Sequence, residues 1–143
     1  MSMILEKRWQ FKIIYTNSDG GSRGNPGPGT IGVLVRNDES ILEMYSEKIG
    51  NVTNNIAEYR ALIKALELAM KHTKSELTCV LDSELIVKQL LGEYRVKNKM
   101  LLQLFLRIQK LQENFKKIKY LHVRRTDKFQ QIVDSLVNIE FDK

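Results

Sequence analysis

Hydrophobic and polar residues follow one another along the chain in segments that match the periods of strands and helices. Runs rich in β-branched and aromatic residues predict three strands, at 11–16, 30–36 and 41–48. The first strand is expected to end at Asp19, where a glycine-rich loop begins, and residues 37–40 are expected to form a hairpin turn. Apolar residues at helical spacing then predict a long helix from about residue 54 to residue 72.

The second half of the chain continues as strands joined by helices. The pattern predicts a short strand at 77–81, helices at 82–91 and 100–115, a last strand at 118–123 and a last helix at 129–139. The order βββαβααβα predicts an α/β fold, a five-stranded mixed β-sheet flanked by α-helices, whose later strands are parallel because helices connect them. We expect residues 11–143 to form one domain after a short N-terminal lead-in, residues 1–10.

Length and composition exclude several classes of protein. The chain has 143 residues and one cysteine, so an intrachain disulfide framework is impossible. Its longest apolar runs are far below the ~20 residues of a membrane-spanning helix, and its N-terminus lacks the apolar core of a signal peptide. We therefore expect a cytoplasmic protein without membrane contact, in which Cys79 is a buried apolar side chain.

The net charge of +6 is unevenly distributed along the chain. Residues 1–85 carry 10 basic and 11 acidic side chains, whereas residues 86–143 carry 13 basic and 6 acidic ones. Such asymmetry is typical of proteins that bind polyanions, but a basic surface also serves solubility alone. The charge by itself leaves both interpretations open.

Four carboxylates occupy positions that an α/β sheet can gather. They are Asp19 at the end of the first strand, Glu58 in the first turn of the long helix, Asp82 after the fourth strand and Asp134 on the last helix. Because the carboxyl ends of parallel strands share one edge of a sheet, Asp19 and Asp82 are expected to meet there. Hard divalent cations such as Mg²⁺ prefer carboxylate oxygens, and two such ions can activate water against a phosphodiester.

Each acid also has a purely structural interpretation. Asp19 precedes a glycine, which is a common turn pair, and Glu58 could close a capping box with Asn55. Asp82 could cap the helix that follows it, and Asp134 lies on a polar stripe typical of a solvated helix face. Spacing alone does not decide between these interpretations, whereas the sequence around each acid does.

Segments around the four acids resemble the signatures of one enzyme family, type 1 ribonuclease H. They are SDGGSRGNPGPG at 18–29, TNNIAEYRAL at 53–62, DSELIV at 82–87 followed by GEYRVK at 92–97, and DSLVN at 134–138. Four signatures in order on a matching pattern of elements are far more specific than any one of them. The resemblance covers nearly the whole chain from about residue 11 and is strongest to the shorter, bacterial and archaeal members.

The resemblance implies a function and a set of site residues. The family cleaves the RNA strand of RNA–DNA hybrids by two-metal hydrolysis and leaves 3′-hydroxyl and 5′-phosphate ends. By resemblance, the catalytic and metal-binding carboxylates are Asp19, Glu58, Asp82 and Asp134. The implied cofactor is Mg²⁺, two ions per site, with Mn²⁺ as a substitute. The implied substrate-binding residues are Gly20, Asn25, Thr53, Asn54, Asn55, Ser83, Arg95, Lys97 and Arg125.

The C-terminal signature departs from the family pattern. Members usually carry Asn-x-x-Ala-Asp, whereas this chain has Gln130 and then Gln-Ile-Val before Asp134, and the preceding segment is about two residues longer. Asp127 is therefore an alternative to Asp134. The loop also lacks the histidine that many members use, and Arg124 or Arg125 could contact a phosphate in its place.

The basic handle of longer family members is absent between residues 92 and 100. Arg95, Lys97 and Lys99 remain there as a small basic patch suited to salt-dependent phosphate contacts. The partner implied is an RNA–DNA hybrid, and we expect a monomer with no obligatory protein partner. Trp9 in the lead-in is expected to pack at an edge of the sheet.

Two other functions stay open on the sequence. The altered last signature is compatible with a non-catalytic RNA–DNA hybrid-binding module on the same fold. A proofreading-type exonuclease also uses clustered carboxylates, but its first strand carries Asp-x-Glu, whereas two glycines follow Asp19 here. Cleavage of a labelled hybrid in magnesium decides between an enzyme and a binding module.

Overall fold

The structure is a computed structural model that describes residues 13–143. The predicted lead-in at 1–10, with Trp9, and the predicted start of the first strand at residue 11 lie outside the described residues. The elements are β1 (Ile14–Ser22), β2 (Gly27–Arg36), β3 (Ile41–Val52), α2 (Asn54–Ala69), β4 (Glu76–Leu81), α3 (Glu84–Leu90), α4 (Lys99–Gln112), β5 (Lys117–His122) and α5 (Lys128–Phe141). The predicted order βββαβααβα is confirmed.

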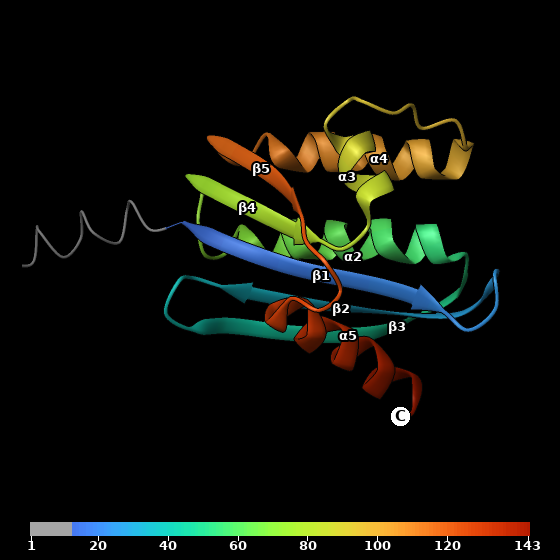
Figure 1. Ribbon diagram of the computed structural model, residues 1–143. Helices are drawn as coiled ribbons and strands as arrows, with labels where there is room; N and C mark the ends of the chain where they lie inside the picture. Colours follow the sequence, from blue (N-terminus) through green and yellow to red (C-terminus); the bar gives the residue numbers. More distant parts are fainter. Residues whose placement is uncertain (1–12) are drawn as a thin grey trace, which may run out of the picture.

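The sheet is mixed, as predicted. Its strand order is β3-β2-β1-β4-β5 (Figure 1). The pairs β3–β2 and β2–β1 are antiparallel, whereas the pairs β1–β4 and β4–β5 are parallel. The first three strands are antiparallel because short loops join them. β4 and β5 each follow helices that carry the chain back to the same end of the sheet, so they run parallel to β1. The carboxyl ends of β1, β4 and β5 therefore point the same way.

The prediction that the first strand ends at Asp19 is wrong. β1 continues to Ser22, because Gly20 and Gly21 pair in register with Ile31 and Thr30 of β2. Glycine lowers strand propensity, which is why the sequence pattern indicated a loop there. Asp19 consequently projects from within a paired strand, and so its backbone is held by the sheet.

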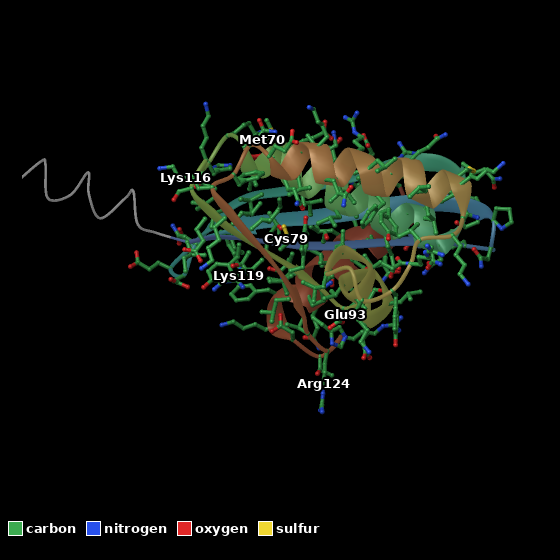
Figure 2. All side chains as sticks on the ribbon, turned by 90° about the horizontal axis from the view of Figure 1, so that it is seen from above. Met70, Cys79, Glu93, Lys116, Lys119 and Arg124 are labelled. Carbon is green, nitrogen blue, oxygen red and sulfur yellow. The ribbon has the colours of Figure 1, made fainter. Side chains whose placement is uncertain are left out.

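Helices cover both faces of the sheet. α2 packs on one face against β1 and β2 and carries α4 on its outer side, whereas α5 lies on the opposite face against β1, β2 and β3 (Figure 1). Most of the apolar core lies between α2, α3, α4 and the sheet, and it includes Tyr59, Leu62, Leu66, Ile86 and Ile108. Cys79 of β4 is fully buried in this core, as predicted (Figure 2). No helix among residues 13–143 is both long and apolar enough to cross a membrane.

Gly20 sets the distance between α2 and β1. A Cβ atom at Gly20 would lie 2.3 Å from the carbonyl oxygen of Ala57 and 2.7 Å from the backbone nitrogen of Glu58. Both atoms are helix backbone, so neither can rotate away. The missing side chain thus lets α2 approach the strand immediately beside Asp19.

Gly20→Ala should force α2 away from β1 and lower the free energy of unfolding by about 1–3 kcal/mol, the usual cost of overpacking. Gly21→Ala is the matched control, because a Cβ there meets nothing closer than 3.7 Å. Denaturant unfolding of the two variants measures the difference. Equal stability of the two variants would contradict the close-approach explanation.

Candidate functional site

The parallel pairing of β1 with β4 brings two carboxylates together. The last residues paired between these strands are Asn17 and Val80, and Asp19 and Asp82 each follow two positions later. In a parallel ladder equal steps keep residues side by side and on the same face. The expected meeting of Asp19 and Asp82 at the sheet edge is confirmed.

Glu58 reaches the same place from the second turn of α2. The N-cap of this helix is Thr53, whose hydroxyl accepts a hydrogen bond from the backbone nitrogen of Ile56 at 3.3 Å. The predicted capping box between Asn55 and Glu58 is therefore wrong, because the helix begins two residues earlier than that box requires. The Glu58 carboxylate takes no part in capping.

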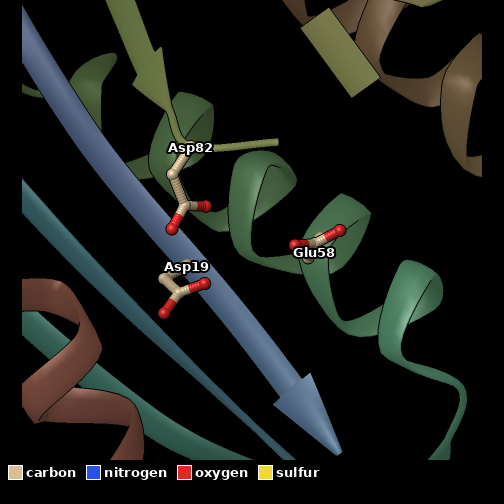
Figure 3. Close-up of side chains that lie close together, drawn as sticks. All are labelled: Asp19, Glu58 and Asp82. Carbon is tan, nitrogen blue, oxygen red and sulfur yellow. The ribbon is translucent and has the colours of Figure 1, made fainter. Parts of the chain in front are cut away.

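The three acids form one cluster. One carboxylate oxygen from each of Asp19, Glu58 and Asp82 lies within 4.8 Å of the others. Figure 3 shows the side chains facing a shared space between β1, the end of β4 and α2. Ser18, Leu81 and Ser83 complete the lining of this small pocket.

The cluster is electrostatically unfavourable without a cation. Burial, followed by the charges of Asp82, Glu58 and Asp134, raises the pKa of Asp19 to about 8. Burial and the charge of Asp82 raise the pKa of Glu58 to about 7, and burial also raises the pKa of Asp82. Partial desolvation and mutual repulsion are the two causes that a bound divalent cation would counter.

Arg125, rather than Arg124, lies beside the acids. Its Nε is 3.8 Å from Oδ2 of Asp82. The positive charge of Arg125 offsets part of the rise in the pKa values of Asp82 and Glu58 that burial causes. The Arg125 side chain is 92% exposed, so it is accessible to a ligand bound beside the acids. Arg124 projects away from the body of the molecule (Figure 2).

Asp134 is not one of the three acids whose oxygens meet, but its charge acts on two of them, whereas Asp127 has a capping role. Asp134 is exposed on α5, and its charge contributes to raising the pKa of both Asp19 and Asp82. Asp127 is the N-cap of α5, since its Oδ2 accepts hydrogen bonds from the backbone nitrogens of Phe129 and Gln130 at 3.1 Å each. The structure therefore favours Asp134 as the fourth acid.

The polar residues predicted to touch substrate gather at the start of α2. The Asn25 Oδ1 accepts a hydrogen bond from the backbone nitrogen of Asn54 at 3.0 Å. The Asn54 Oδ1 accepts one from the backbone nitrogen of Ser22 at 3.3 Å, which ties the β1–β2 loop to the helix. Asn55 is exposed beside them. Ser83, another predicted contact, caps α3 instead, so the carboxylate of Asp82 is not used as the cap.

Arg95 and Lys97 lie apart from the acids, in a groove of about 570 Å³ beyond the end of α3. The lining of this groove is otherwise largely apolar and consists of Gln89, Gly92, Tyr94, Val96, Leu102 and Phe105. α3 connects the two regions, since Asp82 precedes the helix and Gly92 follows it. With seven residues, the helix is about 10 Å long. Sequence reasoning predicted the two cations but missed the apolar groove, because Leu102 and Phe105 come from a different helix.

Sequence reasoning also missed a buried pair of amides, Asn17 and Gln130. Asn17 lies in the middle of β1, and Gln130 in the first turn of α5. The sequence carried little signal for this pair, because Asn17 stands among other polar residues of β1, Thr16, Ser18 and Asp19, and Gln130 lies more than 110 positions away.

Comparisons with known proteins agree with this fold. Residues 17–139 match the family model described as reverse transcriptase-like. The crystal structure of RNase H1 from Halobacterium salinarum superposes with a TM-score of 0.86 at 34% identity, over 91% of this chain and 98% of that one. The chain belongs to the type 1 ribonuclease H family.

Two further proteins are similar to this chain in sequence. LC11-RNase H1, solved in complex with an RNA/DNA hybrid, has a TM-score of 0.83 and 39% identity over 90% of this chain and 96% of that one. A bifunctional protein of Mycobacterium tuberculosis is 40% identical over 114 residues, which is 78% of this chain. The chain spans only 31% of the length of that mycobacterial protein.

The donor set of this cluster fits a hard divalent cation. Asp19, Glu58 and Asp82 offer only carboxylate oxygens, which are the ligands that Mg²⁺ and Mn²⁺ prefer. No histidine or cysteine takes part in the cluster, so soft-metal chemistry has no ligand here. The raised pKa values of Asp19 and Glu58 are the electrostatic cost that such an ion would remove.

Metal-free protein should lose stability as the pH rises from about 5 to 8. Because the pKa of Asp19 is about 8 when folded and 3.8 as an isolated group, the folded state keeps a proton that the unfolded state has released. Asp19→Asn should therefore raise the Tm of chelator-treated protein at pH 8 by roughly 3 °C or more. Saturating Mg²⁺ should remove the pH dependence of the wild type.

Thermal unfolding across this pH range, with and without chelator, measures the effect. Asp38→Asn, in the turn at the far end of the sheet, is the control that should keep the wild-type slope. A metal-free wild type with a flat Tm profile would contradict the clustering of the charges.

Asp134→Ala and Asp127→Ala should have opposite effects. Asp127→Ala should lower the free energy of unfolding by about 1 kcal/mol, because α5 loses its N-cap. Asp134→Ala should leave stability within about 0.5 kcal/mol and should weaken Mn²⁺ binding in calorimetry. If Asp127→Ala weakens Mn²⁺ binding more than Asp134→Ala does, the assignment of the fourth acid is wrong.

Proposed function

We propose that this chain is a metal-dependent endoribonuclease that hydrolyses the RNA strand of RNA–DNA hybrids. The observation that carries the proposal is the cluster of Asp19, Glu58 and Asp82, each in the position of a family signature. The hybrid bound to LC11-RNase H1, a relative of 39% identity, supports the choice of substrate. Products with 3′-hydroxyl and 5′-phosphate ends follow if water attacks the phosphorus and the 3′ oxygen leaves.

Asp19, Glu58, Asp82 and Asp134 are the residues that would hold two Mg²⁺ ions, with Mn²⁺ as a substitute. When bound, such ions supply an activated water and stabilise charge on the leaving oxygen. The protein's part is to hold four carboxylates on rigid elements, namely a paired strand, a strand end and two helices. Arg125 lies where it can contact the phosphate and offset its charge.

Recognition of the RNA strand is assigned to the loop and helix start beside the acids. Asn25, Asn54 and Asn55 present short amides there, which can donate to or accept from a ribose 2′-hydroxyl. The positive end of the α2 helix dipole, which lies at the same place, also favours a nearby phosphate. Thr53 and Ser83 would act in the same region, and Gly20 contributes by letting α2 approach β1.

Recognition of the DNA strand is assigned to the groove of Arg95 and Lys97. Two exposed cations at the rim of an apolar groove suit a sugar–phosphate backbone, whose phosphates are charged and whose deoxyribose rings are not. The distance spanned by α3 lets one duplex contact both the groove and the acids. Such contacts are independent of sequence and weaken as salt increases.

We also propose that residues 11–143 act as one monomeric domain in the cytoplasm. The described residues share one sheet, and Cys79 is a free buried thiol, which suits a reducing compartment. The N-terminal lead-in is given no role.

Cleavage of an end-labelled RNA–DNA hybrid in Mg²⁺ tests the proposal. Wild-type protein should cut the RNA strand and should leave duplex DNA intact, and chelator should stop cleavage. Asp82→Asn should lower kcat by about 100-fold or more while the hybrid still binds, because one ligand oxygen loses its charge. Asp38→Asn, far from the cluster, should cleave like the wild type.

Two outcomes would contradict the proposal. A wild-type protein that retains hybrid uncut in both Mg²⁺ and Mn²⁺ is a binding module and not an enzyme. An Asp82→Asn variant with wild-type turnover would show that the acidic cluster does not hold the catalytic metal.

A further inference from the structure

Gln130 is a fully buried polar side chain on the helix that carries Asp134. It is 1% exposed, and both ends of its amide are hydrogen-bonded to β1. Its Oε1 accepts from Nδ2 of Asn17 at 3.2 Å, and its Nε2 donates to the carbonyl oxygen of Ser18 at 2.9 Å. A single side chain thus spans the two residues that immediately precede Asp19.

The direction of these hydrogen bonds is set by a charged neighbour. Nε of Arg36 donates to Oδ1 of Asn17 at 3.1 Å, and a guanidinium can only donate. Asn17 must therefore donate from its Nδ2 to Oε1 of Gln130. The Nε2 of Gln130 then donates to the carbonyl oxygen of Ser18. The guanidinium of Arg36 also lies 3.9 Å from the ring centroid of Phe129, the residue before Gln130. The network has one consistent arrangement and joins β2, β1 and α5.

Gln130 and Asp134 share one face of α5. They are four residues apart, a little more than one helical turn and about 6 Å along the axis. Fixing Gln130 against Ser18 therefore constrains where Asp134, one turn further along α5, lies relative to Asp19. The charge of Asp134 contributes to raising the pKa of Asp19, which agrees with this placement.

The next turns of α5 are seated against β2 by close contacts. Gly32 pairs with Asp19 in the sheet. A Cβ atom on Gly32 would lie 2.7 Å from the carbonyl oxygen of Val133, so the helix backbone approaches the strand closely here. Further along, Oγ1 of Thr30 donates to the carbonyl oxygen of Val137 at 2.9 Å. These contacts set the depth of the helix, whereas Gln130 makes the hydrogen bonds that set its position along β1.

We propose that Gln130, together with Asn17, is a positioning residue that sets the location of Asp134 relative to Asp19, and through it the metal affinity of the site. The expected effect of Gln130 on kcat rests on the proposed function, whereas its expected effect on metal affinity does not. Displacement of α5 along β1 would break both hydrogen bonds of Gln130. Because a buried amide without partners costs about 1–3 kcal/mol, the two hydrogen bonds resist this displacement.

A double-mutant cycle on Mn²⁺ affinity tests the proposal without any substrate. Gln130→Leu and Asp134→Asn should each weaken Mn²⁺ binding by about 10-fold in calorimetry. If Gln130 acts through Asp134, Gln130→Leu should have no further effect in the Asp134→Asn background. Gln131→Leu, at the neighbouring exposed position, is the matched control and should bind like the wild type. Additive effects of the two substitutions would overturn the proposal.

Stability and turnover separate positioning from simple packing. Asn17→Leu/Gln130→Leu replaces both amides by apolar groups and should recover part of the stability lost in Gln130→Leu, although Nε of Arg36 and the carbonyl oxygen of Ser18 lose these partners. Its kcat on the hybrid should stay about 10-fold to 100-fold below wild type with KM little changed, because the acid is misplaced. Recovery of kcat and Mn²⁺ affinity along with stability would overturn the proposal. If the wild type cleaves nothing, the proposed function fails, and the affinity cycle still tests Gln130.

Discussion

Repulsion among carboxylates is the constraint on which this structure depends. Asp19, Glu58 and Asp82 have oxygens within 4.8 Å of one another in a partly buried pocket, and their pKa values rise in consequence. Each acid is held by an element that cannot easily yield: a paired strand, a helix pressed against that strand, and a strand end followed by a separately capped helix. The fold thus keeps an unfavourable charge arrangement ready for a cation.

The same constraint gives meaning to residues that carry no charge. Gly20 admits the backbone of α2, Thr53 and Ser83 cap helices so that neighbouring acids are not used for capping, and Gln130 holds the helix of Asp134. Removing any of these leaves all four carboxylates in the sequence, but it changes where they lie. Substitution at such positions therefore affects metal binding through geometry rather than through the ligands.

The sequence predicted the order of the elements and the meeting of Asp19 with Asp82, because apolar periodicity and parallel strand ends are local or topological rules. It placed the strand end at Asp19 wrongly, and the capping box that Asn55 and Glu58 could form is not present, because glycine and asparagine are each compatible with several local structures. It left Asp134 and Asp127 open, since only contacts between β1 and α5, more than 110 residues apart, distinguish them. The groove of Arg95 and Lys97 escaped prediction for the same reason.

The position of α5 at the far side of the sheet has a consequence for how the protein is made. The first three acids are present once residue 82 has been synthesised, but the strands that carry Asp19 and Asp82 pair in parallel and must wait for the intervening helix. Asp134 follows 52 residues later on the last element, and it reaches the cluster only when Gln130 and Val133 dock. The four acids therefore come together only when the C-terminal helix is docked, although three of them lie within the first 82 residues of the sequence.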